Sequence, residues 1–574
     1  MKLRLPILLS VTLVSGACTS PTSDSAADSV FVNGTFYTSD NDIALASAVA
    51  VRDGEFVFVG DDASAFIDPE TNVYDLGGKA VIPGLIDAHS HPGLVAMSAN
   101  VQQLDDTSSM ETLMASIRKM VTEDTTSDIL IGGFWPNEYF GVRGPTREEL
   151  DQIEPDRPLI LYDSWAHTVW VNSRALEQAG VSRETDDVVP GFAFYQRDQD
   201  GRPTGWITES AATLFVNKFQ SVTPAMEDAL LEYLEYYRSV GVTTVLDAGN
   251  FGLDRDIYAV ISRLDKEGRL PVRYHGAYTL FVPSDLDGAV ETLEELGEEF
   301  NSENVRIDTL KLFFDGILET RTAAVSDEYL DTPENKGNML LSRQQVHKLI
   351  VDLDEAGLNL HVHAVGNQST SRILNAVEDT HESLGRAPAI RITICHLEVV
   401  EESDIDRFEN LGVVANFTPH WWVGGDMSWV AQGIGDKAEN MQRARSFIDA
   451  GATVTFSSDI TDRYEWKSDR ANPFVGMQVG HNRQDVGVDP EGDVMPPNDE
   501  RVERIDLLTG YTSNAANQLD RSDEIGSIAV GKRADLVVLD RNVLEIDRYE
   551  IHETKPVAVV TNGEIVFGTL ATKN

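Results

Sequence analysis

The chain has 574 residues, of which 42% are hydrophobic and 8% aromatic, a composition typical of a globular protein with a large core. Its 94 Asp and Glu residues outnumber its 46 Lys and Arg residues, which gives a formal charge of −48 and a pI near 4.4. Such a surface repels nucleic acid and anionic lipid, and we interpret it as an adaptation to a saline environment rather than as a sign of a cationic partner.

Residues 1–18 have the composition of an export signal, with a short basic start, an apolar run over 6–14 and small residues before Cys18. The apolar run is too short to remain as a membrane-spanning helix. Cys18 follows Gly-Ala and resembles the lipidated cysteine of a bacterial lipobox, although Ser15 replaces the usual aliphatic residue and leaves simple signal cleavage as the alternative. Residues 19–29 read as a flexible tether. We therefore expect an exported, periplasmic protein anchored through Cys18.

Both ends of the remaining chain are rich in short β-strand patterns. Residues 30–80 carry Asn33-Gly34 and Asp53-Gly54, which predict hairpins, and residues 516–574 turn on Asn562-Gly563. No comparable material lies between the two ends. The sequence therefore predicts one composite β-sandwich built from the N- and C-terminal segments.

Residues 81–515 alternate amphipathic helical patterns with buried, β-branched strand patterns. A helix, a glycine and then a strand, repeated over several hundred residues, predicts an α/β fold of the (β/α)8, TIM-like barrel type. Active sites in such barrels lie at the carboxyl ends of the strands. No glycine-rich phosphate loop follows the first strand, which disfavours a doubly wound nucleotide-binding sheet.

An insertion at about 101–238 is longer than one βα unit requires. It contains the aromatic-rich segments 132–150 and 164–176, which suit either a substrate-covering element or the core of a subdomain. The candidate substrate contacts in the chain, each weighed against a packing role, are Trp135, His167, Asn172 and His420.

Residues suited to binding a divalent cation lie at the ends of the predicted barrel strands. His89 and His91 are two positions apart, so a strand directs both side chains to the same face. Neutral imidazole is the commonest metal ligand in proteins. The other strand-end candidates are Lys311, His361, His363, His396 and Asp459. Scattered core histidines would show no such preference, so the sequence predicts a metal site at this end of the barrel.

Several motifs together resemble the metal-dependent amidohydrolase superfamily and, within it, the YtcJ-like branch, amidohydrolase family 3. They are PGLIDAHSHPG, LKLFFDG followed by RTAA, HVHAVGN, ITICH, FSSD and IGSIAVGKRADLVVLD. The resemblance covers almost the entire chain after the export signal.

The resemblance implies that His89 and His91 bind one metal and that His363 and His396 bind a second. It further implies that Lys311, carboxylated by carbon dioxide, bridges the two metals and that Asp459 is both a ligand and the general base. The implied cofactor is one or two zinc ions, with manganese or iron as alternatives. His361 lies on the same strand face as His363 and is the alternative ligand. Asp315 and Asp87 are candidates for orienting the ligands.

The chain departs from the family pattern at Asn367, where aspartate is usual, and at Leu318 and Glu319, where glycine or serine is usual. These changes leave the ligand set intact and bear on the substrate. We predict a hydrolase that cleaves carbon–nitrogen bonds other than peptide bonds, of N-acyl or N-formyl amide type, through a metal-activated hydroxide. The alternatives are a lactone, ester or cyclic-amide hydrolase and a non-catalytic binding lipoprotein. The expected partner is a small-molecule substrate, with membrane contact only through lipid on Cys18, and oligomerisation stays open.

Overall fold

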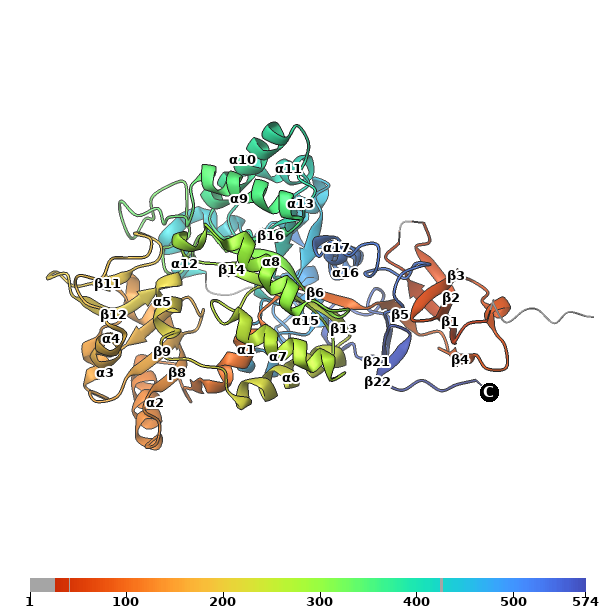
Figure 1. The fold of residues 1–574 in the computed structure, drawn as a ribbon, viewed down its shortest axis with the longest axis horizontal. Coiled ribbons are helices and arrows are strands. Elements are labelled where there is room, and N and C mark those ends of the chain that lie inside the picture. The colour runs from red at the N-terminus through yellow and green to blue at the C-terminus, as the bar shows by residue number, and fades with distance from the viewer. Residues whose placement is uncertain (1–25, 41, 424–426, 574) are drawn as a thin grey trace, which may run out of the picture.

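The computed structural model describes residues 26–40, 42–423 and 427–573 (Figure 1). The predicted export signal, Cys18 and most of the predicted tether lie outside the described residues. Among the helices that the structure describes, none is long and apolar enough to cross a membrane.

Eight parallel strands form a barrel and follow one another around it in chain order. Backbone hydrogen bonds bring its first and last strands together, because the Asp459 amide donates to the His89 carbonyl at 2.9 Å and the His91 amide to the Ile460 carbonyl at 3.0 Å. The predicted TIM-like barrel is therefore confirmed. The strands are β6 (Leu85–Ser90), β13 (Val242–Asp247), β14 (Arg273–Leu280), β15 (Val305–Phe313), β16 (Asn359–Ala364), β17 (Ile392–His396), β18 (Val414–Phe417) and β19 (Val454–Phe456).

Helices alternate with these strands along the chain, and α9 (Arg343–Ala356) shows how the sequence specifies them. The Ser342 side chain accepts the Gln345 amide at the start of the helix, and Gly357 takes the left-handed conformation at its end. Residues at helical spacing, Val346, Leu349, Ile350 and Leu353, are buried against the barrel. The other main barrel helices are α6 (Pro224–Ser239), α7 (Asp254–Lys266), α8 (Ala289–Phe300), α10 (Asn367–Leu384), α11 (Glu402–Leu411), α13 (Ala444–Asp449), α16 (Arg504–Gly510) and α17 (Ser513–Gln518).

The two ends of the described chain meet in a β-rich unit at one end of the molecule, where red and blue strands lie together in Figure 1. Strand β5 (Ala80–Pro83) pairs with β1 (Ser29–Tyr37) on one side and with β20 (Leu536–Leu539) on the other. The predicted composite unit of N- and C-terminal segments is thus present, and its strands form one hydrogen-bonded sheet around a buried apolar cluster. Its other strands are β2 (Leu45–Arg52), β3 (Glu55–Gly60), β4 (Asn72–Asp75), β21 (Pro556–Thr561) and β22 (Glu564–Gly568).

One of the predicted hairpins is wrong. Asp53-Gly54 joins β2 to β3 and Asn562-Gly563 joins β21 to β22, each with two consecutive positive φ angles. Asn33-Gly34 instead lies inside β1, where the pairing with β2 shifts register between Val32 and Phe36. Asn33 has a φ of 56°, so the dipeptide forms a bulge and the strand continues past it.

The insertion forms its own six-stranded sheet, on the opposite side of the barrel from the β-rich unit in Figure 1. Its aromatic residues mostly pack a subdomain core, in which the rings of Trp135, Phe140 and Trp170 meet with centroids 5.0 to 6.0 Å apart. Its strands are β7 (Gln102–Gln103), β8 (Leu130–Trp135), β9 (Leu159–Asp163), β10 (Thr168–Val171), β11 (Tyr195–Arg197) and β12 (Pro203–Thr208), and its helices are α2 (Met110–Glu123), α3 (Arg147–Asp151), α4 (Ser173–Ala179) and α5 (Glu209–Val216).

A buried ion pair joins the barrel to the β-rich unit and gives a test of that junction. Two guanidinium nitrogens of Arg273, in β14, donate hydrogen bonds to the carboxylate of Asp535, which directly precedes β20. Both side chains are at most 5% exposed. Removing one partner leaves the other charge buried and unpaired. We therefore expect Arg273→Met to lower the free energy of unfolding by about 3 to 5 kcal/mol, measured by chemical denaturation. The double variant Arg273→Met/Asp535→Leu should be more stable than the single variant, and equal losses in both would contradict this explanation.

Candidate metal centre

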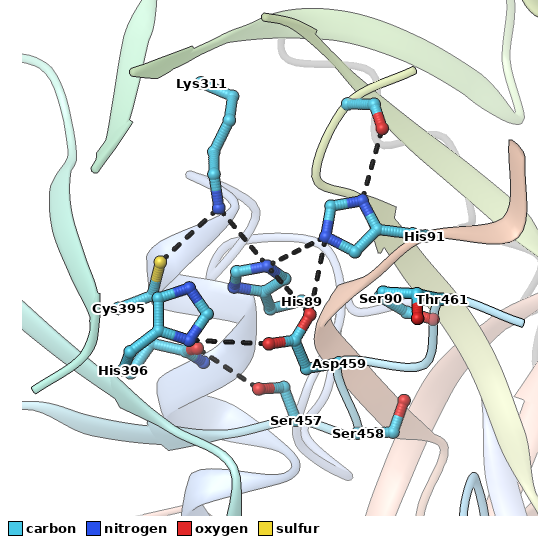
Figure 2. A network of polar contacts seen from close by, with 12 residues as sticks. His89, Ser90, His91, Lys311, Cys395, His396, Ser457, Ser458, Asp459 and Thr461 are labelled. Carbon is cyan, nitrogen blue, oxygen red and sulfur yellow. Dashed lines mark hydrogen bonds and ion pairs between the residues drawn. The ribbon is translucent and has the colours of Figure 1, made fainter. Parts of the chain in front are cut away.

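The imidazole rings of His89 and His91, at the end of β6, and of His396, at the end of β17, converge at the carboxyl end of the barrel (Figure 2). His89 Nε2 lies 3.3 Å from His91 Nε2, and Asp459 Oδ1 lies 3.4 Å from each of these nitrogens. Asp459 Oδ2 is also 3.4 Å from His396 Nδ1. The single carboxylate thus contacts three histidines, and it follows β19 with a φ of 51°.

The electrostatics of the cluster favour neutral imidazoles. Burial lowers the pKa of His89 well below its usual value, and the charge of Lys311 lowers it further, followed by His361, His396 and His91. Burial likewise lowers the pKa of His396. A neutral imidazole keeps a lone pair that can bind a metal. His89 and His396 are therefore in the protonation state that a cation site requires.

Lys311 lies within this cluster and is 1% exposed. Its Nζ is 3.2 Å from His89 Nε2 and 3.4 Å from Cys395 Sγ, and within the described parts of the chain it pairs with no carboxylate. A buried ammonium without a counterion is costly. Conversion to a carbamate would turn this group into an anionic acceptor, which suits a position among metal ligands.

His361 and His363 differ in what they contact. His363 lines the cavity described below, and its Nδ1 is 3.3 Å from Asp315 Oδ1. Asp315 is fully buried and accepts four further hydrogen bonds, from the amides of Ala324, Val365 and Gly366 and from the Ser369 hydroxyl. This anchoring fixes the ring so that Nε2 is free for a ligand.

His361 does not line the cavity. Its Nε2 lies 3.0 Å from His89 Nδ1. It therefore positions His89. Asp87 accepts the amides of His89 and Ser458 and the Tyr237 hydroxyl, so it holds the backbone beneath the histidines.

The donors present fit a divalent cation. His89, His91 and Asp459 place ligand atoms within 4.8 Å of one another, and so do His89, Cys395 and His396. His396 Nε2 is buried without a hydrogen-bond partner among the described residues, as a ligand atom would be in a metal-free chain. Nitrogen and oxygen donors of this kind suit zinc and related ions. The structure brings together all six predicted ligands, and their individual roles stay predictions.

A cavity of about 420 Å³ opens beside these residues. Its apolar wall includes Phe134, Phe251, Phe313, Ile317 and Trp421, and the Trp421 ring stacks on His396 with centroids 5.7 Å apart. Its acidic side chains include Glu209, Glu319, Glu398, Asp462 and Glu465. Burial raises the pKa of Glu398, and the charges of Glu319, Asp315 and Asp459 raise it further. Most of these residues could not be predicted from the sequence, because they come from several loops and share no motif.

Of the four predicted substrate contacts, only His167 lines the cavity. Trp135 is fully buried in the core of the insertion, where its indole donates to the Leu161 carbonyl. Asn172 caps α4 and bonds backbone groups of the preceding loop. His420 is 2% exposed and contacts the Asn472 carbonyl at 3.1 Å. In the structure these three residues have packing and capping contacts away from the described cavity wall, and their contact with substrate stays a prediction.

His167 forms a close pair with Glu209, at 2.6 Å between Nδ1 and Oε2. Glu209 also accepts the hydroxyls of Thr320 and Thr322. Burial lowers the pKa of His167, but the charge and hydrogen bond of Glu209, with a contribution from Asp163, outweigh burial and raise the pKa to about 9. His167 is therefore an imidazolium at neutral pH.

This pair predicts a pH-dependent contribution to stability. Because the pKa of His167 is higher in the folded chain than the unfolded value of 6.5, its stabilising contribution is complete below pH 6.5 and is lost as the pH rises to about 9. The expected size is about 3 kcal/mol. Melting temperatures measured across this range should fall more steeply for the wild type than for Glu209→Gln. Parallel curves would show that the pair is not charged.

The model of the "Amidohydrolase family" matches residues 72–567. The N-substituted formamide deformylase of Arthrobacter pascens is 27% identical over 559 residues, which are 94% of this chain and 98% of that protein. The putative amidohydrolase YtcJ of Bacillus subtilis is 27% identical over 558 residues, 94% of this chain and 99% of that protein.

Among solved structures, an uncharacterized metal-dependent hydrolase from Pyrococcus furiosus has a TM-score of 0.64 and 26% identity, covering 90% of this chain and all of that chain. The family match spans the barrel, the insertion and the strands β4, β5, β20 and β21 of the β-rich unit, and it confirms the resemblance inferred from the motifs. The family implies a divalent metal, and the histidine cluster supplies suitable donors. This chain belongs to the amidohydrolase family and is a metal-dependent hydrolase.

Proposed function

We propose that the protein hydrolyses a carbon–nitrogen bond other than a peptide bond in a small molecule, with N-acyl or N-formyl amines as the substrate class. The observation that carries this proposal is the position of Asp459, whose carboxylate contacts His89, His91 and His396 beside the cavity. The similarity to a formamide deformylase over nearly the full length of both chains supports the bond type.

The proposed ligands are His89, His91, Lys311 as its carbamate, His363, His396 and Asp459. One or two zinc ions held there would supply a Lewis acid and an activated water. Asp459 would take a proton from that water and deliver it to the leaving nitrogen. His167 would donate a hydrogen bond from its imidazolium to the substrate carbonyl, whose oxygen gains negative charge during attack.

Metal analysis combined with a substrate screen tests the proposal. The purified enzyme should contain zinc, manganese or iron, and it should hydrolyse at least one class among N-formyl amines, N-acyl amino acids and cyclic amides. Lactones and esters serve as the comparison, because turnover of these compounds alone would show that the enzyme cleaves carbon–oxygen bonds instead of carbon–nitrogen bonds. A metal-loaded enzyme that turns over none of these compounds would contradict hydrolysis of this kind.

We also propose that the protein is exported and anchored through lipid on Cys18, on the basis of residues 1–18 alone. Fractionation of cells that express the wild type and Cys18→Ser tests this. The wild type should sediment with membranes and the variant should not. Equal membrane association of both would contradict lipidation.

A further inference from the structure

Two acidic side chains on the cavity wall have no partner of opposite charge. Glu319 follows β15, which carries Lys311, and Glu398 follows β17, two residues beyond His396. Both line the cavity and are half-buried. Among the residues that the structure describes, neither carboxylate forms an ion pair or accepts a hydrogen bond from another residue's side chain.

The other acidic side chains of the cavity already have hydrogen-bond or ion-pair partners. Glu209 is bonded to His167, Thr320 and Thr322. Asp462 caps α14 (Arg463–Lys467), where it accepts two amides. Asp459 contacts the histidines. The remaining acid, Glu465, accepts the Thr461 amide at 3.4 Å.

The nearby cations His167 and Arg321 also have partners of their own. His167 is paired with Glu209 at 2.6 Å. The Arg321 guanidinium bonds Asp331 at 2.6 and 3.0 Å and donates to the Leu318 carbonyl. Glu319 and Glu398 therefore lie in a partly desolvated wall near His167 and Arg321, but among the described residues neither acid forms an ion pair with these cations. Such a wall favours a ligand that brings a positive charge.

A second observation indicates where the rest of the ligand lies. His396 is 5% exposed, lines the same cavity, and its buried Nε2 has no partner within the described residues. The reacting group therefore belongs at the histidine cluster. Apolar side chains, including Phe251, Phe313 and Ile317, line the same cavity. The cavity thus suits a molecule with a reactive group, an apolar stem and a cationic group.

We propose that Glu319 and Glu398 bind a positively charged nitrogen of the substrate, so that the enzyme selects N-acyl or N-formyl amines that carry a second, cationic amino or guanidino group. This inference rests on the proposed function and narrows its substrate class. The two residues are specificity determinants, because they lie beyond the proposed ligands at the strand ends and leave the histidines and Asp459 to act on the carbonyl.

A matched pair of substrates tests the inference. N-formylcadaverine carries a terminal ammonium where N-formylhexylamine carries a methyl group, and the two are otherwise alike in length. For the wild type we expect kcat/KM to favour the cationic compound by about 10- to 100-fold, the range expected for charge-assisted hydrogen bonds. Glu319→Gln/Glu398→Gln should abolish this preference, mainly by raising KM for the cationic compound. Glu294→Gln, an exposed acid on α8, is the control for the loss of one charge.

Charge reversal provides an independent variant. Glu319→Lys should accept N-formylaminocaproate, whose terminal carboxylate replaces the ammonium, better than the wild type does. Equal kcat/KM of the wild type for the cationic and neutral formamides would overturn the inference while leaving the proposed function intact. Metal loss from the double glutamine variant would also overturn it, because the two acids would then serve the metal centre.

Binding separates failure of this inference from failure of the proposed function. If the wild type hydrolyses neither these formamides nor any other compound of the screen, the proposed function fails, and calorimetry with cadaverine itself still tests the cation site. Cadaverine that binds the wild type, and binds the double variant at least about 10-fold more weakly, would support the site. Equal affinity of both proteins, or no binding to either, would overturn it.

Discussion

Replacing Asp459 by asparagine is expected to lower kcat by about 10²- to 10⁴-fold, the usual contribution of a general acid–base residue. Asparagine keeps the shape of the side chain, so the contacts with His89, His91 and His396 can persist with little change in packing. An amide cannot accept the proton that a carboxylate accepts. The variant should therefore bind substrate with a similar KM and turn it over slowly.

The measurement is steady-state kinetics on the best substrate from the screen, with the metal content determined for the same samples. Asp449→Asn, on α13, is a matched control, because Asp449 is exposed and, among the described residues, forms an ion pair only with Arg445, at 2.7 Å. An Asp459→Asn enzyme that keeps its metal and more than a tenth of the wild-type kcat would remove Asp459 from the proposed chemistry.

Replacing Lys311 by alanine is expected to abolish activity, with a loss of about 10³-fold or more, because a metal site supplies several kcal/mol of transition-state stabilisation. The Lys311 side chain is buried 3.2 Å from His89 Nε2, so its removal leaves a space at the centre of the cluster. A short carboxylic acid such as acetate or propionate could fill that space and replace the carbamate. Partial recovery of activity and of bound metal with these acids is the expected result.

Chloride at the same ionic strength is the control for the rescue. Intact mass of the metal-loaded wild type, measured under conditions that preserve carbamates, should show the added mass of carbon dioxide. An unmodified lysine in a fully active, metal-loaded enzyme would refute the carbamate. Full activity of Lys311→Ala would remove the residue from the metal centre altogether.

The barrel and the position of its site followed from the sequence for local reasons. Periodic patterns, caps such as Ser342 and end glycines such as Gly357 act within a few residues, and the carboxyl ends of parallel strands share one edge. His361 and His363 show the limit of this reasoning. Alternation places both on one face of β16, but only contacts at different depths in the barrel assign one to His89 and the other to the cavity.

The residues around the cavity were harder to predict because their roles depend on contacts between distant segments. Trp135 and His167 come from similar aromatic stretches, yet one is buried in the insertion and the other lies on the cavity wall. The dipeptide Asn33-Gly34 has the composition of a hairpin turn, and only its pairing with β2 and the continuation of β1 make it a bulge. In each case tertiary packing decides between local structures that the sequence permits equally.

The placement of β5 has a consequence for the order in which the chain folds. β5 pairs with β1 from the same end of the chain, but its other edge is covered by β20, more than 400 residues later. During synthesis this edge of the N-terminal sheet therefore stays open and apolar until the whole barrel has been synthesised. This sheet can therefore close only after the barrel segment of the chain has been synthesised. A chain that ends before β20 would keep that edge exposed and would be prone to aggregate or to be degraded.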